Sequence, residues 1–119
     1  MRYMFLIYNK EADRDAASTA EMDRCLKCHL ALIEETGRRG ILQGTAPLHP
    51  TSTARSVRHQ GGKVLVIDGP FAETKEQLGG YYILDCRDLN DALEWAARVP
   101  TVGGTGCVEI RPLMELPAR

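Results

Sequence analysis

The spacing of the hydrophobic positions changes several times along the chain, and each spacing predicts a different element. Residues 2–8 are apolar at nearly every position and rich in β-favouring side chains, which predicts a strand in the middle of a sheet. Residues 41–44, 81–86 and 107–111 have the length and composition of further strands. Residues 9–17 are polar and alanine-rich, so we expect a loop there.

Two segments repeat their apolar residues at helical spacing. The first covers residues 19–37, and Ser18 stands three positions before Glu21, the spacing of a capping box. The second begins after Asp88, whose carboxylate suits a helix N-cap, and ends before Pro100. Both segments are therefore predicted to be amphipathic helices that pack on a sheet.

The adjacent glycines at positions 61 and 62 give the clearest turn signal, because glycine adopts the positive φ angles of a tight hairpin. Residues 53–59 and 63–67 flank them and are predicted to pair as a β-hairpin. A further turn is expected over 68–70, where Asp-Gly-Pro ends the second strand. Residues 73–77 predict a single helical turn.

The order of elements is strand, helix, strand, hairpin, strand, helix, strand. In this order both helices cover one face of a single sheet if both crossovers lie on the same side. We therefore predict the α+β class, with a ferredoxin-like protomer that carries an extra β-hairpin. The strands are apolar on both faces, and a sheet of this kind needs cover on both sides. Two such sheets packed face to face would supply it, which predicts a homodimer with a barrel-like core.

Length and charge restrict the possible functions. With 119 residues, the chain is expected to form one domain over 1–119. Its 44% apolar and 26% charged residues are typical of globular proteins, and its net charge of -1 argues against a nucleic-acid partner. The apolar run at the N-terminus ends at Tyr8, too early for a secretory signal or a membrane span. We therefore expect a cytoplasmic protein with no membrane partner.

Residues 25–29 read Cys-Leu-Lys-Cys-His, the pattern of c-type haem attachment. Haem attachment needs export, a closed zinc site needs four ligands, and a redox pair normally follows a strand at a helix N-terminus. The sequence has no export signal and no second ligand pair at a matching distance, and the motif lies in the middle of a predicted helix. We therefore expect no cofactor and no metal, and interpret Cys25 and Cys28 as small buried thiols.

Two residues are candidates for acid–base chemistry. His29 falls on the apolar face of the first predicted helix, where it is either a structural residue or a general base with a pKa near neutrality. Asp68 follows the hairpin on the rigid frame of Gly69 and Pro70, where it either bonds its own backbone or acts at a cleft. We expect Asp68 to line a pocket that His29 approaches from the helix.

Three further residues are candidates for binding a ligand. Glu73 and Lys75 lie in a polar run without apolar periodicity, so they are either solvated surface or ligand contacts at the same pocket as Asp68. Arg55 in the hairpin either binds an anion or keeps a strand edge soluble.

Residues 66–82 read VIDGPFAETKEQLGGYY, and this stretch resembles the signature of the YCII-related family, in the branch named after its D-G-P-F motif. Residues 2–4, 61–63, 92–96 and 108–112 also resemble the family, in the same order along the chain. The resemblance implies a dimeric α+β barrel of ferredoxin-like protomers. It implies no known reaction, although enzymes of similar fold isomerise lactones, oxygenate aromatic compounds or eliminate chloride.

The resemblance also bears on function. The wider family is thought to use a histidine of its first helix in a His–Asp dyad, which implies His29 and Asp68 here. Relatives of the D-G-P-F branch accompany extracytoplasmic-function sigma factors, which implies a functional link to such a factor. We expect a small-ligand-binding or signalling-associated stress-response protein. The alternative is a cofactor-free isomerase or lyase that acts on a small polar or aromatic molecule.

Overall fold

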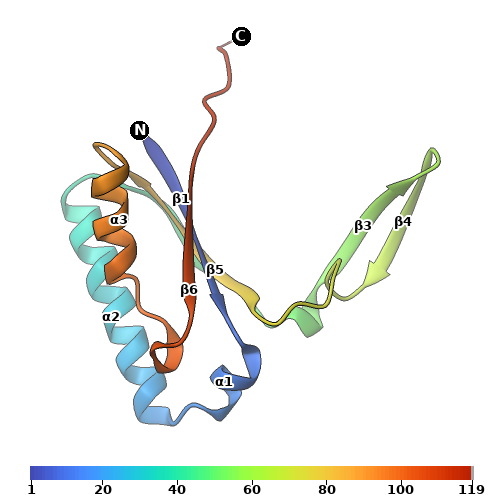
Figure 1. The fold of residues 1–119 in the computed structure, drawn as a ribbon, viewed down its shortest axis with the longest axis horizontal. Coiled ribbons are helices and arrows are strands. Elements are labelled where there is room, and N and C mark those ends of the chain that lie inside the picture. The colour runs from blue at the N-terminus through green and yellow to red at the C-terminus, as the bar shows by residue number, and fades with distance from the viewer. Residues whose placement is uncertain (119) are drawn as a thin grey trace.

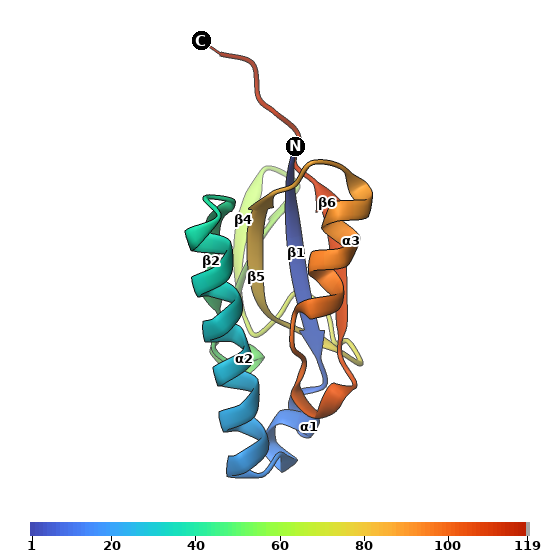
Figure 2. The same ribbon diagram turned by 90° about the vertical axis from the view of Figure 1, so that its left-hand side faces the viewer.

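A computed structural model describes residues 1–118 and has an α+β fold built on a four-stranded antiparallel sheet (Figures 1 and 2). The strands follow the spatial order β2-β5-β1-β6, which is compatible with a ferredoxin-like fold. Their bounds are Arg2–Asn9 for β1, Leu42–Pro47 for β2, Gln77–Asp85 for β5 and Cys107–Pro112 for β6. As predicted, the first strand lies in the middle of the sheet, paired with β5 on one side and β6 on the other.

Two helices, α2 (Thr19–Arg38) and α3 (Leu89–Arg98), cover one face of this sheet (Figure 2). The Ser18 side chain accepts a hydrogen bond from the backbone N–H of Glu21 at 3.1 Å, which confirms the predicted cap of α2. The Asp88 carboxylate accepts from the backbone N–H of Asp91 at 2.8 Å and caps α3 in the same way. Both caps satisfy backbone donors that a helix leaves free at its N-terminus.

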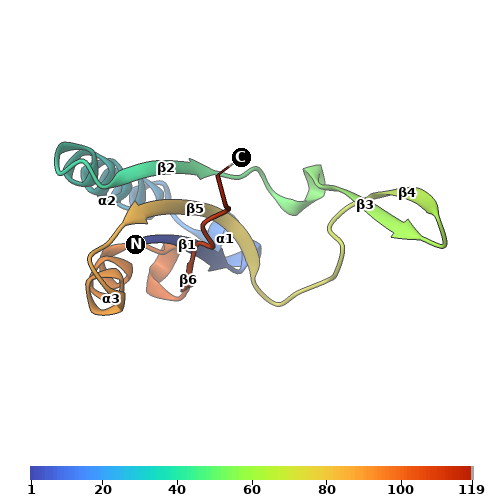
Figure 3. The same ribbon diagram turned by 90° about the horizontal axis from the view of Figure 1, so that it is seen from above.

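The core lies between the helices and the sheet. Every second residue of β1 points into it, and Phe5 at its centre is fully buried. The same alternation in β5 buries Tyr82 and Leu84, while α3 contributes Trp95. The remaining residues of β1 face the opposite side of the sheet, which α2 and α3 leave uncovered (Figure 3).

A separate two-stranded ribbon, β3 (Arg55–Gln60) and β4 (Lys63–Asp68), extends away from the sheet (Figures 1 and 3). The turn between the strands is formed by Gly61 and Gly62, with φ angles of +57° and +79°. The hairpin predicted from these glycines is therefore confirmed. Its isolation from the rest of the molecule was not predicted.

Three local predictions were wrong. Residues 9–17 are not a loop, because α1 spans Glu11–Ala16. Residues 73–77 form no helical turn, and β5 already begins at Gln77. The second strand of the sheet continues past residue 44 to Pro47.

Long-range hydrogen bonds explain the first of these differences. The side-chain oxygen of Gln77 accepts from the backbone N–H of Glu11 at 2.9 Å and so caps the start of α1. The Glu11 carboxylate accepts in turn from the backbone N–H and the hydroxyl of Thr51, at 2.8 and 2.9 Å. Because these partners are distant in the sequence, no local pattern indicates them.

We predict that Leu84→Ala lowers the free energy of unfolding by about 2–5 kcal/mol, because its side chain is fully buried and the truncation leaves a cavity. Leu93→Ala on α3 is the matched control, since Leu93 is 50% exposed, and its effect should stay within about 0.5 kcal/mol. Urea unfolding of both variants measures the difference. Equal losses of stability would contradict this location of the core.

Candidate functional site

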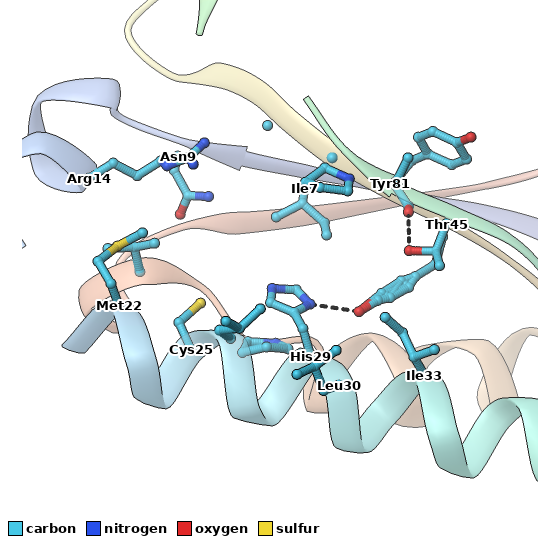
Figure 4. Close-up of a pocket in the computed structure, with 18 residues that line it drawn as sticks. Ile7, Asn9, Arg14, Met22, Cys25, His29, Leu30, Ile33, Thr45 and Tyr81 are labelled. Atoms are coloured by element: carbon cyan, nitrogen blue, oxygen red, sulfur yellow. Dashed lines mark hydrogen bonds between the residues drawn. The ribbon is translucent and has the colours of Figure 1, made fainter. Parts of the chain in front are cut away.

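A pocket of about 330 Å³ lies between α2 and the neighbouring strands β2 and β5 (Figure 4). Most of the side chains around it are apolar. The polar lining residues are few: Asn9, Arg14, Cys25, His29, Thr45 and the two tyrosines Tyr81 and Tyr82. An apolar cavity with a few converging polar groups is the usual form of a small-molecule site.

The helical period of α2 and two glycines of β5 create this space. Met22, Cys25 and His29 recur every three or four residues, so they share the side of α2 that faces the sheet (Figure 4). Gly79 and Gly80 carry no side chain at the opposite wall. At Gly80 a Cβ would lie only 3.1 Å from the carbonyl oxygen of Ala46, so glycine allows β2 and β5 to pair closely there.

His29 and Tyr82 form the polar centre of the pocket. The Nδ1 atom of His29 lies 2.6 Å from the Tyr82 hydroxyl, and the two rings stack with their centres 5.8 Å apart. Burial lowers the pKa of His29, and a hydrogen bond to the backbone of Pro100 opposes this only in part. Burial also raises the pKa of Tyr82 to about 12, against a smaller opposite effect of Thr45. At neutral pH both groups are therefore uncharged, and the phenol can donate to Nδ1 of the imidazole.

Arg14 and Asn9 lie at the other end of the pocket (Figure 4). Among residues 1–118, no carboxylate lies within ion-pair distance of the Arg14 guanidinium. The side-chain oxygen of Asn9 is buried and has no hydrogen-bond partner in this part of the chain. A Cβ at Gly106 would lie 2.4 Å from that oxygen, so only glycine allows the two segments to pack this closely.

The two cysteines of the Cys-Leu-Lys-Cys-His motif differ in burial. Cys25 is partly buried in the pocket, and burial raises the pKa of its thiol, as does the neighbouring Cys28. Cys28 is exposed, so the prediction that both thiols are buried was wrong for this one. Within residues 1–118 no group of three or more His, Cys, Asp or Glu side chains is close enough to hold a metal ion. The absence of a cofactor stays a prediction.

Of the five candidate residues, only His29 lines the pocket. Asp68 lies in the ribbon, where its side chain is 88% exposed and pairs with the Arg55 Nε at 3.1 Å. Glu73 and Lys75 lie in the exposed segment between the ribbon and β5. The expected meeting of His29 and Asp68 in one pocket therefore does not occur within a single chain, because the ribbon extends away from the sheet. The roles of all five residues stay predictions.

The sequence did not indicate Arg14, Asn9 or Tyr82 as pocket residues. Arg14 belongs to a segment that reads as a loop, and Tyr82 to a segment that reads only as a strand. Tyr82 does pack in the core, but its hydroxyl also reaches His29, 53 residues away. No local signal indicates a contact of this range.

No helix within residues 1–118 combines the length and the apolar character needed to cross a membrane.

Comparisons with known proteins agree with the motif resemblance. The family model described as the YCII-related domain matches residues 1–117. A protein of Rhizobium meliloti (strain 1021), described as uncharacterised, is 41% identical over 114 residues, an alignment that covers 95% of this chain and 92% of the relative. The chain therefore belongs to the YCII-related family.

Proposed function

We propose that the protein binds a small carboxylic acid with an apolar or aromatic body in the pocket beneath α2. The observation that carries this proposal is the distribution of polar groups in the pocket. A guanidinium without a carboxylate partner in residues 1–118 lies at one end, an uncharged His–Tyr pair lies further in, and apolar side chains separate them.

Arg14 is the anchor for the carboxylate of the ligand. None of the lining residues is an Asp or Glu, so the pocket itself holds no competing negative charge. An arginine can bind a carboxylate through two parallel N–H···O bonds, and such charge-assisted bonds are stronger than neutral ones. The partly buried position of Arg14 reduces the screening of this interaction by solvent.

The apolar walls and the His29–Tyr82 pair select the rest of the ligand. A body that buries about 100 Å² of apolar surface gains about 2.5 kcal/mol from removal of that surface from water. Met22, Leu26 and Ile33 supply this contact from α2. The uncharged His29–Tyr82 pair suits a hydroxyl group of the ligand, which can donate to the Tyr82 oxygen, because an ionic group there would lose hydration without gaining a counter-charge.

A second candidate function is acid–base catalysis by an isomerase or lyase, and the position of His29 in the pocket favours it. An imidazole that is neutral near pH 7 can accept a proton from a bound molecule. The pocket lining of the chain contains no Asp or Glu. Catalysis by a His–Asp dyad would therefore require a carboxylate that comes from outside this pocket. His29→Gln would then reduce turnover by about 10²–10⁴-fold, whereas a binding protein shows no turnover to lose.

We further infer that the protein is a homodimer formed through the open face of the sheet. Met4, Leu6 and Tyr8 of β1 point to this face and are only partly buried, and Ile83 lies beside them on β5. An antiparallel sheet that is apolar on both faces requires cover on both. A second copy of the chain offers the same apolar surface.

Arg14→Gln is expected to weaken binding of phenylacetate about 10–100-fold, because it removes a charge-assisted hydrogen bond. Wild-type protein should bind phenylacetate, used here as the probe, more tightly than the uncharged phenylacetamide. Titration followed by NMR chemical shifts of the pocket residues measures both effects.

The matched control for this experiment is Arg24→Gln, since Arg24 is exposed on α2 and does not line the pocket. It should bind phenylacetate like the wild type. Equal binding of phenylacetate and phenylacetamide by wild-type protein would overturn the role of Arg14.

A pH dependence of stability is expected from His29. Its pKa in the folded chain lies below the ordinary value of 6.5, so the unfolded chain binds the proton more readily. The resulting stabilisation is complete above pH 6.5 and is lost as the pH falls through the lower pKa of the folded state. His29→Gln should therefore lose less thermal stability than wild type between pH 7 and 5.

His49→Gln is the control for the pH experiment, because His49 is exposed. Its melting temperature should follow that of the wild type across the same pH range. If His29→Gln has the same pH dependence as the wild type, the imidazole is not buried as described.

The homodimer predicts sedimentation at twice the 13.2 kDa mass of the chain at micromolar concentration. Leu6→Lys should shift the protein toward the monomer, because it places a charge in the centre of the apolar open face. A folded wild-type monomer at this concentration would contradict the proposed dimer.

A further inference from the structure

We propose that the β3–β4 ribbon, residues 55–68, is an arm that packs on a second copy of the chain. This inference depends on the proposed homodimer and adds a second contact region to it. It also places the D-G-P-F segment, which begins at Asp68, the last residue of the arm, beside the partner.

The arm lacks support within its own chain. Its strands pair with each other from Arg55↔Asp68 to Gln60↔Lys63 and with no strand of the four-stranded sheet. Figures 1 and 3 show the ribbon standing apart from the helices and the sheet. A two-stranded hairpin is at best marginally stable in water without packing against another surface.

Both faces of the arm carry exposed apolar side chains among polar ones. The register places Val57 opposite Val66 on one face, with Val64 further along, and these three side chains are 60%, 69% and 59% exposed. Leu65 and Ile67 lie on the other face and are 41% and 40% exposed. Adjacent β-branched and aliphatic residues that are exposed in this way mark a protein contact surface.

The base of the arm is closed by hydrogen bonds between its two ends, and the segment just before it is held to α1. The backbone N–H of Gly69 donates to the carbonyl of Ala54, and the Ser56 hydroxyl donates to the carbonyl of Gly69, both at 2.8 Å. Thr51, just before the arm, donates to Glu11 of α1. These bonds fix the point from which the ribbon leaves the molecule.

The surface area of the chain supports a second copy as the partner that covers the arm. The chain exposes 8545 Å², whereas a compact monomer of 13.2 kDa exposes about 6,400 Å², an excess of about 2,100 Å². Its radius of gyration is 16.3 Å, against about 13.5 Å for a compact chain of this length. Obligate homodimers bury about 1,000–2,500 Å² of each partner, so the excess matches what such a dimer would cover.

Figure 1 shows why the arm would reach a second copy that covers the open face of the sheet. α2 and α3 lie on one side of the sheet and the arm extends on the other, the side of the open face. A copy seated on the open face therefore meets the arm, and a two-fold axis makes the contact reciprocal. The strands β2 and β5 precede and follow the arm in the chain, and Pro47 and Gly79 near their ends line the pocket.

Val66→Lys tests the arm directly. Val66 is exposed in the single chain, so the variant should fold with wild-type circular dichroism. We expect its dimer dissociation constant, measured by sedimentation, to rise at least about 10-fold, because a charge would be buried at the contact. Leu93→Lys is the matched control, since Leu93 is also exposed but lies on α3, on the far side of the sheet, and should dimerise like the wild type.

Hydrogen exchange provides a second readout on the unaltered protein. Amides of residues 55–68 should be protected above the dimer dissociation constant and should exchange faster on dilution below it. If the wild type dimerises while Val66→Lys matches Leu93→Lys and the arm exchanges equally at both concentrations, the arm proposal fails and the sheet-face dimer stands. A wild-type monomer would overturn both, while the phenylacetate titration tests the pocket independently.

Discussion

The alternation of buried and less buried residues along β1 and along residues 79–84 of β5 is the constraint on which the rest of the structure depends. One face of the sheet receives Phe5, Tyr82 and Leu84 and is covered by α2 and α3. Because two helices form only one layer, the other face stays open. The core, the pocket beneath α2 and the apolar surfaces offered to a second copy all follow from this unequal cover.

The pocket lies in the layer between the helices and the sheet, so its polar groups are partly removed from water. His29 and Tyr82 leave water but retain a hydrogen bond to each other, which offsets part of the cost of burying them. The same burial keeps both groups uncharged, so the centre of the pocket is polar without being ionic. Arg14 of α1 supplies the positive charge of the pocket, and Gln77 caps the start of this helix.

Local signals in the sequence were sufficient for most elements. Ser18 and Asp88 indicated the helix starts, and the Gly61-Gly62 pair indicated the hairpin, because caps and turns depend on residues only a few positions apart. α1 was missed, because its hydrogen-bond partners Gln77 and Thr51 lie 66 and 40 positions away from Glu11. His29 was identified as a candidate from its apolar helix face.

The sequence by itself determined most of the elements, their order and the family, since periodicity, capping and motif spacing are properties of neighbouring residues. Only the tertiary structure decided which side chains meet. It joined His29 to Tyr82 and brought Arg14 to the same pocket, while it left Asp68 on a ribbon outside it. The physical reason is that such contacts depend on how strands pair and in which direction a hairpin leaves the sheet, and neither is encoded in the spacing of adjacent residues.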